Sequence, residues 1–171
     1  MREIASRYCC EHWPRPLANL SAGAVCSVLL LSGCGLFGSS GPNQPIQTRL
    51  IAFQVAQTAN QDAPVAVDIV YVLDPQLIPQ LSQMTARDWF QKRSAIRQAF
   101  PAGFDLTSRE LVPGQKAPDE EIKDPATDAI AAFVFANYSS EGTHRARVDA
   151  LERISIALGE KDFSIMSQDM Q

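Results

Sequence analysis

Apolar and polar residues alternate along several short stretches of the chain, which is the pattern of β-strands with one buried face. The first two stretches are residues 48–57 and 65–73, and Asp68 falls on the polar side of the second. Their apolar sides carry Ile51, Phe53 and Val55, followed by Val65, Val67, Ile69, Tyr71 and Leu73. The polar connection 58–64 between them has the length of a hairpin loop, so the pattern predicts that the two strands pair as a β-hairpin.

A single helix is predicted after the second strand. Thr85 with Asp88 three residues later resembles a capping box, in which the two side chains satisfy free backbone N–H groups at a helix start. Pro101 ends the helix, because proline has no N–H to donate. Residues 75–84, with two prolines, fit neither a strand nor a helix clearly. The apolar residues spaced to share one helical face are Trp89, Phe90, Ile96 and Phe100.

The rest of the chain has the pattern of further short strands separated by turns. Residues 127–138 are apolar on both sides, which indicates a central strand covered on both faces. Pro113-Gly114 is a strong turn signal, and residues 116–125 are polar and charged, as in an exposed loop. The other strand candidates are residues 103–112, 144–150, 153–158 and 162–167. About seven strands and one helix indicate a mostly β protein, a β-sandwich with one helical insertion.

The N-terminal segment has the pattern of a secretory signal peptide. Arginines near the start precede an apolar run over residues 17–31, which is shorter than the roughly 20 residues that span a bilayer. The run ends in a sequence that resembles the lipobox of bacterial lipoproteins, Leu31, Ser32, Gly33 and Cys34. We therefore expect residues 1–33 to be removed and Cys34 to carry a lipid that tethers the protein to a membrane.

Cysteine usage and composition agree with an exported domain. Cys34 is the last of the four cysteines, so the mature domain has no thiol for a disulfide. Residues 34–47 are rich in glycine, serine and proline and are expected to be a lipidated flexible tether, followed by one periplasmic domain over residues 48–171. The formal net charge is −4 and there is no basic patch, which argues against nucleic-acid binding.

Few side chains after Cys34 offer chemistry. The single histidine there, His144, is expected at the surface, and it has no second histidine to share a metal. The acidic run Asp119-Glu120-Glu121 lacks the alternating spacing of a calcium loop and is interpreted as a solvated loop. Neither a phosphate-binding loop nor a nucleophile elbow is present. We therefore expect no cofactor, no metal, no small-molecule substrate and no catalysis, and we predict a binding or assembly role.

The order of these features resembles the TssJ family of type VI secretion lipoproteins, also called SciN or VasD. The resemblance covers most of residues 50–140, and Thr143-His144-Arg145 departs from it, because the family has a Trp-Arg pair there. After the lipobox and the tether, the similar elements are the valine-rich strand ending in Tyr71-Val72-Leu73, then Trp89-Phe90, the turn Leu111-Val112-Pro113-Gly114 and the strand ending in Asn137-Tyr138.

This resemblance implies a transthyretin-like β-sandwich with added helical elements. It also implies an outer-membrane lipoprotein that faces the periplasm, in agreement with Gly35 after the lipidated cysteine. The implied partner is the periplasmic domain of the inner-membrane protein TssM, which works with TssL in the type VI secretion membrane complex. The family makes that contact through the loop between its first two strands, which implies Asn60, Gln61 and Asp62 as the partner-binding residues here.

Two other functions stay open from the residues alone. One is a different periplasmic assembly lipoprotein, a pilotin or chaperone, that binds an exported or outer-membrane subunit by strand addition at a sheet edge. The other is a small-ligand binder or hydrolase. A pocket that holds His144 with a carboxylate in hydrogen-bond reach favours this last function, and an exposed His144 argues against it.

Overall fold

The computed structural model describes residues 44–124 and 126–168. The expected signal peptide, the lipobox residues Leu31, Ser32 and Gly33, and the lipid-bearing Cys34 lie outside these ranges. Within the ranges, no helix is long and apolar enough to cross a membrane.

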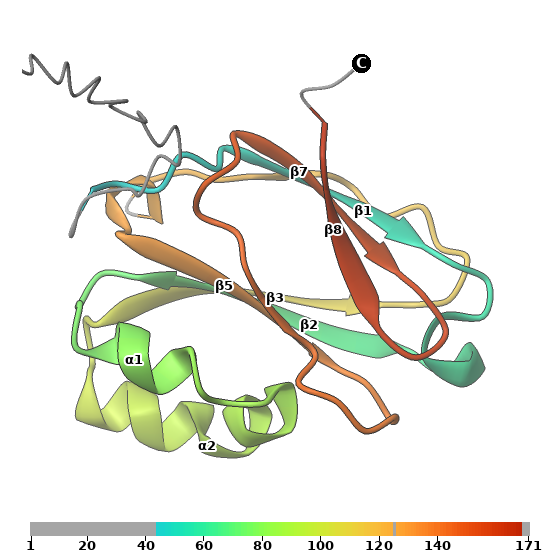
Figure 1. The fold of residues 1–171 in the computed structure, drawn as a ribbon, viewed down its shortest axis with the longest axis horizontal. Helices are drawn as coiled ribbons and strands as arrows, with labels where there is room; N and C mark the ends of the chain where they lie inside the picture. The colour runs from blue at the N-terminus through green and yellow to red at the C-terminus, as the bar shows by residue number, and fades with distance from the viewer. Residues whose placement is uncertain (1–43, 125, 169–171) are drawn as a thin grey trace, which may run out of the picture. The chain divides into compact units, whose positions relative to one another are not determined.

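Two four-stranded sheets lie face to face, and two helices cover the outer face of one of them (Figure 1). One sheet has the strand order β4-β1-β7-β8 and the other has the order β3-β2-β5-β6. The strands are β1 (Leu50–Val55), β2 (Val65–Val72), β3 (Phe104–Leu111), β4 (Glu120–Glu121), β5 (Ala131–Asn137), β6 (Arg145–Arg147), β7 (Arg153–Leu158) and β8 (Phe163–Ser167). The helices are α1 (Leu77–Leu81) and α2 (Ala86–Ala99), with short 3-10 turns η1 (Ala59–Asp62) and η2 (Ala126–Asp128). The predicted β-sandwich with a helical insertion is confirmed.

The predicted hairpin between the first two strands is wrong. β1 and β2 lie in different sheets: β1 pairs in parallel with β7, from Leu50 opposite Arg153 to Val55 opposite Leu158, and β2 pairs with β3 and β5. The connection 58–64 therefore crosses from one sheet to the other. The alternation identified the buried faces correctly, because both strands turn them into the same interior. A period-two pattern does not specify which strand lies alongside.

The interior between the sheets is filled by the apolar sides of β1, β2, β5 and β7. Its residues include Ile51, Phe53, Val65, Val67, Ile69, Tyr71, Ala132, Val134, Ala136, Ile154, Ile156 and Leu158. β5 is covered on both faces as predicted, because its other side packs Phe133 and Phe135 against the helices. Each large side chain buried in this way contributes about 1.5–3 kcal/mol.

The long helix α2 begins as the sequence predicts. The hydroxyl of Thr85 accepts the backbone N–H of Asp88 at 3.1 Å, and the carboxylate of Asp88 accepts the N–H of Thr85 at 3.3 Å. Trp89 is fully buried and stacks on Phe135, with 5.1 Å between the ring centroids. The stretch left unassigned, residues 75–84, holds the short helix α1.

Asp68 connects the helical layer to the sheet beneath it. Its carboxylate is buried and accepts hydrogen bonds from the indole N–H of Trp89 at 2.8 Å, from Arg93 at 2.6 Å and from the hydroxyl of Ser108 at 2.7 Å. The sequence placed Asp68 on the side of its strand away from the apolar face, and this is confirmed. That side is nonetheless buried, because α2 lies over it.

The folded domain begins before residue 48, where the sequence placed its start. Ile46 is buried, and its N–H donates to the carbonyl of Ala129 at 2.7 Å. The N–H of Gln47 donates to the carbonyl of Asp149 at 2.8 Å. These contacts leave residues 34–45 for the expected tether.

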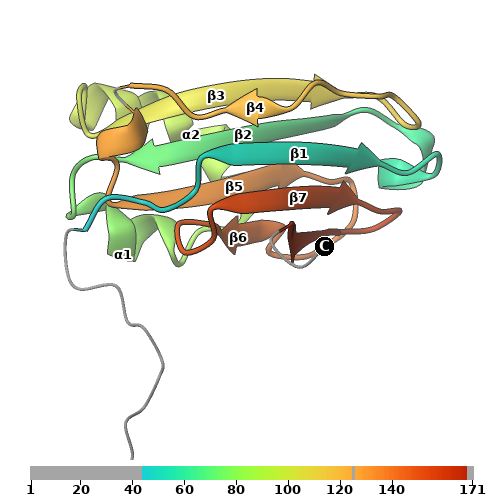
Figure 2. The ribbon, with the colours of Figure 1, turned by 90° about the horizontal axis from the view of Figure 1, so that it is seen from above.

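The two sides of the sandwich have different edge strands. On one side, the segment predicted as an exposed loop, 116–125, contributes β4, and Glu120 of β4 forms an ion pair with Arg109 of β3. Figure 2 shows β3 and β4 along this side and β6 along the other. On that other side the sheets end in β6 and β8. β6 has three residues, fewer than the predicted strand 144–150, and the described part of the chain provides no further strand beyond β8.

Candidate partner-binding site

Three connections meet at one end of the sandwich: residues 56–64 after β1, residues 139–144 after β5 and residues 159–162 after β7. We call them the loop cluster. Asn60 joins all three, because its backbone N–H donates to the carbonyl of Gly159 at 3.1 Å and its side-chain Oδ1 accepts the N–H of Ser139 at 2.7 Å.

The connection between β1 and β2 has a strained backbone. Asn60, Gln61 and Asp62 have φ values of +48°, +57° and +64°, in the left-handed region that costs L-residues about 1–2 kcal/mol each. Asparagine accepts this region more readily than most residues. The turn is held by the amide of Asn60, whose Nδ2 donates to the carbonyl of Pro64 at 3.0 Å, and by the N–H of Ala63, which donates to the carbonyl of Asn60 at 3.2 Å. Such strain persists only where surrounding contacts enforce it, and it is concentrated at functional sites.

The three residues expected to bind a partner differ in position. Asn60 is only 3 % exposed, and its side chain is used inside the protein. Gln61 and Asp62 are exposed. The structure therefore makes Asn60 a positioning residue and leaves Gln61 and Asp62 available to another molecule. The sequence pattern indicated only an exposed polar turn, because nothing local to residues 58–64 shows that Asn60 is bound to Ser139.

The turn after β3 is hydrogen-bonded to the first connection of the loop cluster. The N–H of Gln115 donates to the carbonyl of Val112 at 3.0 Å, and the N–H of Gly114 reaches the carbonyl of Ala56 at 3.1 Å. Gly114 has a φ of +71°, which residues with a side chain rarely adopt, and a Cβ there would displace the end of the Gln57 side chain. The predicted Pro113-Gly114 turn is therefore confirmed, and it fixes the start of the connection between β1 and β2.

His144 is buried, which contradicts its predicted place at the surface. Only 5 % of the residue is exposed. Its Nδ1 lies 2.9 Å from the carboxylate Oδ1 of Asp162, its Nε2 lies 3.0 Å from the carbonyl oxygen of Ser140, and its ring lies 5.0 Å from that of Tyr138. Gly142 lets the chain pass over the ring, because a Cβ at that position would be 2.6 Å from the imidazole. The sequence has no local signal for this burial, since Asp162 is 18 residues away.

The surroundings of His144 match a structural link better than a catalytic base. In a hydrolytic triad, the ring nitrogen opposite the carboxylate accepts the proton of a nucleophilic hydroxyl. Here that nitrogen, Nε2, faces the backbone carbonyl of Ser140 instead. Burial, with the negative charge of Asp162 as a smaller cause, raises the pKa of the neighbouring Tyr138 to about 12, so this phenol is neutral at physiological pH. Both features expected to favour a ligand binder or hydrolase are present: His144 lines a pocket of about 180 Å³ and has the carboxylate of Asp162 within hydrogen-bond reach. The Nε2 atom nevertheless has a backbone carbonyl as its partner rather than a nucleophilic hydroxyl.

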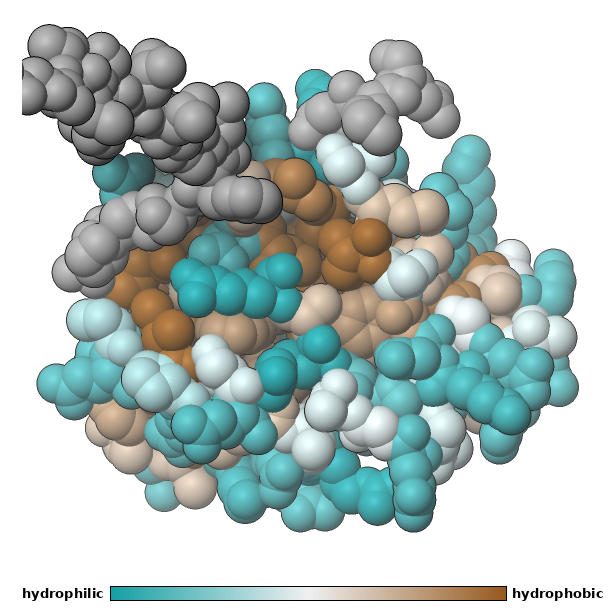
Figure 3. Space-filling model, viewed as in Figure 1, coloured by the Kyte–Doolittle hydropathy of each residue, from teal (hydrophilic) through white to brown (hydrophobic). Residues whose placement is uncertain are grey.

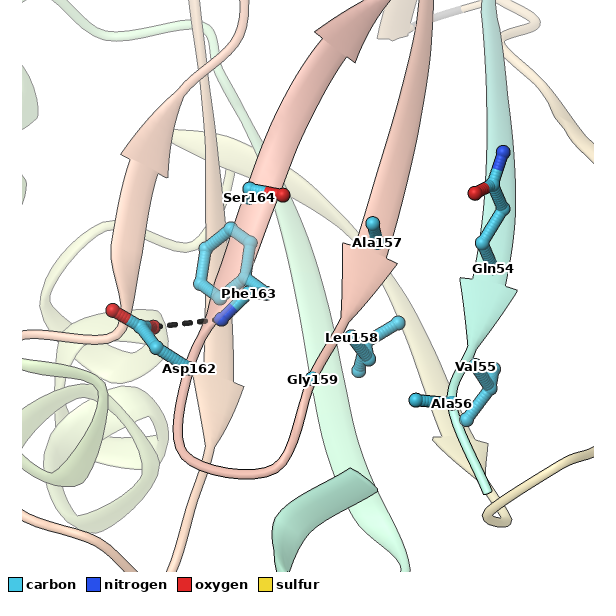
Figure 4. A pocket seen from close by; sticks show the side chains of 9 residues that line it. All are labelled: Gln54, Val55, Ala56, Ala157, Leu158, Gly159, Asp162, Phe163 and Ser164. Atoms are coloured by element: carbon cyan, nitrogen blue, oxygen red, sulfur yellow. Dashed lines mark hydrogen bonds between the residues drawn. The ribbon is translucent and has the colours of Figure 1, made fainter. Parts of the chain in front are cut away.

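An open hollow of about 600 Å³ lies beside the loop cluster (Figure 4). Its walls come from the end of β1, the end of β7 and the start of β8. The residues that line it include Val55, Ala56, Leu158, Gly159, Asp162 and Phe163. Figure 4 shows the side chain of Asp162, just before β8, where its carboxylate accepts the N–H of Phe163 at 2.8 Å. The hollow is open, and its lining is mostly apolar or small with Gln54 and Asp162 as polar exceptions, a surface suited to a protein segment.

The acidic run after β3 does not form a metal site. Glu120 is paired with Arg109, and Glu121 lies 3.6 Å from the amine of Lys123. Across residues 44–124 and 126–168, no group of three or more His, Cys, Asp or Glu side chains could hold a metal ion.

Three solved structures that share this fold belong to the type VI secretion system. The lipoprotein TssJ1 from Pseudomonas aeruginosa matches with a TM-score of 0.56 and 16% identity, over 75% of this chain and 100% of its own. Lip from Serratia marcescens, a membrane-bound component of the type VI secretion system, matches with a TM-score of 0.51 and 14% identity, over 69% and 96%. A chain of a type VI membrane complex matches with a TM-score of 0.51 and 14% identity, over 71% and 98%. No protein-family model and no curated protein matches the sequence.

These matches define the fold of the chain as that of the type VI secretion lipoproteins. At 14–16% identity, the likeness is one of fold. The resemblance to TssJ that the sequence indicated is confirmed at this level, and so is the β-sandwich.

Proposed function

We propose that the chain is an outer-membrane lipoprotein that faces the periplasm and holds a TssM-like inner-membrane protein in a type VI secretion membrane complex. The lipid on Cys34 is the membrane anchor in this proposal. Gln61 and Asp62 make the contact with the periplasmic domain of the partner, and Asn60 fixes the backbone that presents them. Neither a cofactor nor a small-molecule substrate takes part.

The observation that carries this proposal is the left-handed turn at Asn60, Gln61 and Asp62. Three successive left-handed residues that are not glycine cost free energy, and a connection that served only to join two strands would not need them. The turn exposes Gln61 and Asp62 while Asn60 ties it to two other loops. A rigid, exposed polar turn loses little conformational freedom on binding, which favours affinity.

The expected anchor also fits a short-range role. Residues 34–45 would form a tether of about twelve residues, which spans roughly 20 Å as a flexible chain. Several acyl chains on one cysteine are sufficient for stable attachment, because each buried methylene contributes about 0.8 kcal/mol. The tether would join the domain at the start of β1, and the loop cluster lies at the other end of this strand, where it can meet a protein that reaches across the periplasm (Figure 1).

The test is a binding measurement between the mature lipoprotein in detergent and the purified periplasmic domain of the TssM-like protein of the same cell. We expect Asp62→Lys to weaken binding at least tenfold, because it reverses a charge within the contact. Asp119→Lys is the matched control, since Asp119 is exposed and lies outside the loop cluster. Equal affinity for the wild type and Asp62→Lys contradicts the proposed contact.

A second measurement tests the anchor. We expect Cys34→Ala to move the protein from the outer-membrane fraction to the soluble periplasmic fraction. Recovery of Cys34→Ala in the outer membrane contradicts lipid anchoring at this residue. Capture of only an exported or outer-membrane subunit by the wild-type protein, and not of the TssM-like protein, supports a pilotin or chaperone role instead.

A further inference from the structure

β8 differs from the other strands at the ends of the two sheets. β3, β4 and β6 all carry charged residues, whereas β8, Phe163 to Ser167, carries none and has no proline. The charged residues of the other three strands are Asp105, Arg109, Glu110, Glu120, Glu121, Arg145 and Arg147. Proteins commonly protect edge strands with charges, prolines, bulges or very short lengths, because a bare edge pairs with other chains. Among the described edge strands, only β8 lacks the charges.

The apolar side of β8 is incompletely covered. Phe163 and Ile165 pack against the interior but stay half-buried, whereas Ile156, directly opposite Ile165 on β7, is fully buried. On the other face of β8, Met166 is 43 % exposed. Figure 3 shows apolar surface gathered over the region of β7 and β8 on this side of the molecule. A strand placed beyond β8 would cover Phe163 and Ile165 as β8 covers the side chains of β7.

The backbone of β8 is oriented to receive such a strand. The N–H of Gln168, just after β8, donates to the carbonyl of Arg153 at 3.0 Å, toward β7. Backbone N–H groups alternate in direction along a strand, so the N–H of Ile165, three residues earlier, points away from β7. The outer edge of β8 therefore offers a backbone donor at Ile165 beside two half-covered apolar side chains.

We propose that β8 is a docking edge on which an extended, uncharged segment of the partner adds as a fifth strand of the sheet β4-β1-β7-β8. The segment carries apolar residues at alternate positions, which cover Phe163 and Ile165, while its backbone pairs with the outer edge of β8. This inference rests on the proposed function, since it takes the TssM-like protein as the partner.

A second copy of the chain is a less suitable partner for β8, because the two copies would bury too little surface area. β8 has five residues, which extend over about 17 Å. Pairing confined to so short a strand buries less than the roughly 1,000 Å² expected of a stable interface. A partner that binds the loop cluster can reach β8 without a gap, because Asp162 and Phe163 line the hollow at the start of β8. The loop contact and the added strand together then form one continuous surface.

The test measures amide hydrogen exchange by NMR for the mature lipoprotein, alone and with the periplasmic domain of the TssM-like protein. We expect the amide of Ile165 to exchange at least tenfold more slowly in the complex. We also expect Ile165→Pro to weaken binding at least tenfold, since proline removes an outward N–H and is tolerated at that position of an edge strand. Glu121→Ala is the control, because Glu121 is exposed on β4 at the opposite edge of the same sheet, and we expect its affinity to stay within twofold of the wild type.

The outcomes separate this inference from the proposed function. Protection of Gln61 and Asp62 without protection of Ile165 overturns the added strand and leaves the loop contact standing. Protection at neither place overturns both. Protection of Ile165 in the free protein, together with a dimeric mass in solution, overturns the partner strand in favour of pairing between two copies. Because the exchange of Ile165 is measured in the wild type, the test does not depend on the folding of Ile165→Pro.

Discussion

The side-chain oxygen of Asn60 accepts the backbone N–H of Ser139 at 2.7 Å, across 79 residues of sequence. This contact explains how an exposed turn with an unfavourable backbone stays fixed. Asn60 joins the crossing between the two sheets to the turn after β5, and its own N–H joins the same crossing to Gly159. A single buried amide therefore sets the position of Gln61 and Asp62.

We predict that Asn60→Ala lowers the free energy of unfolding by about 1–3 kcal/mol. The change leaves the N–H of Ser139 without its acceptor, and alanine is less suited than asparagine to a positive φ. Urea unfolding measures the loss, and Gln61→Ala is the control, since Gln61 is exposed and exposed substitutions usually change stability by less than about 0.5 kcal/mol. Equal effects of the two substitutions would show that Asn60 does not hold the turn. The resemblance to the TssJ family had implied that both residues contact the partner.

The strain in the turn predicts that one substitution, Gln61→Gly, stabilises the protein. Glycine at position 61 removes a left-handed penalty of about 1–2 kcal/mol and adds a backbone entropy cost of about 0.5–1 kcal/mol. We therefore expect Gln61→Gly to raise the free energy of unfolding slightly, by about 0.5–1 kcal/mol. Gln54 lies in the extended strand β1, so Gln54→Gly adds only the backbone entropy cost and should lower the free energy of unfolding. Destabilisation by Gln61→Gly as large as that by Gln54→Gly contradicts the assignment of strain to the turn.

The carboxylate of Asp68 makes a buried hydrogen-bonded link between α2 and the sheet beneath it, in addition to the bond from Arg97 to the carbonyl of Phe104. Asp68→Ala leaves the buried indole N–H of Trp89 without an acceptor and separates Arg93 from its ion-pair partner, so we expect a loss of about 3 kcal/mol. Ser108→Ala removes one of the three donors and should lose about 1 kcal/mol. Urea unfolding followed by tryptophan fluorescence measures both. A loss below 1 kcal/mol for Asp68→Ala would mean that packing and the other hydrogen bonds of α2 hold the helix without Asp68.

The start of α2 predicts a dependence on pH. Hydrogen bonds from Lys92 and Thr85 lower the pKa of Asp88 from its ordinary 3.8 to about 2. A carboxyl group with a lower pKa in the folded state stabilises the fold above its unfolded pKa, and this contribution is lost as the pH falls through the folded value. The stability difference between the wild type and Asp88→Asn should therefore shrink between about pH 4 and pH 2. NMR titration of Asp88 checks the pKa directly, and a value near 3.8 would show that the hydrogen bonds from Lys92 and Thr85 do not lower it.

The parts of the fold that follow from local pattern were predicted correctly. The capping box at Thr85 and Asp88, the turn at Gly114 and the two-sided burial of β5 each depend on a few neighbouring residues or on a short apolar run. The pairing of β1 with β7 was missed, because the partners are about a hundred residues apart and both faces of the sandwich show the same alternation.

The candidate site was predicted only in part. The polar connection 58–64 was identified, but the internal role of Asn60 and the burial of His144 depend on contacts with Ser139 and Asp162. Those contacts exist only once the two sheets have brought their loops to one end. β8 was predicted as a strand, but its place at the edge of a sheet is a property of the topology.

The most direct test of the central claim places a photocrosslinking amino acid at position 61 of the full-length protein in living cells. We expect a crosslink from position 61 to the TssM-like protein. We expect no such crosslink from the exposed control position 119, and a weaker one from position 61 when Cys34 is replaced by alanine. Crosslinking to the TssM-like protein from position 119 but not from position 61 would contradict the assignment of the loop cluster as the partner-binding site.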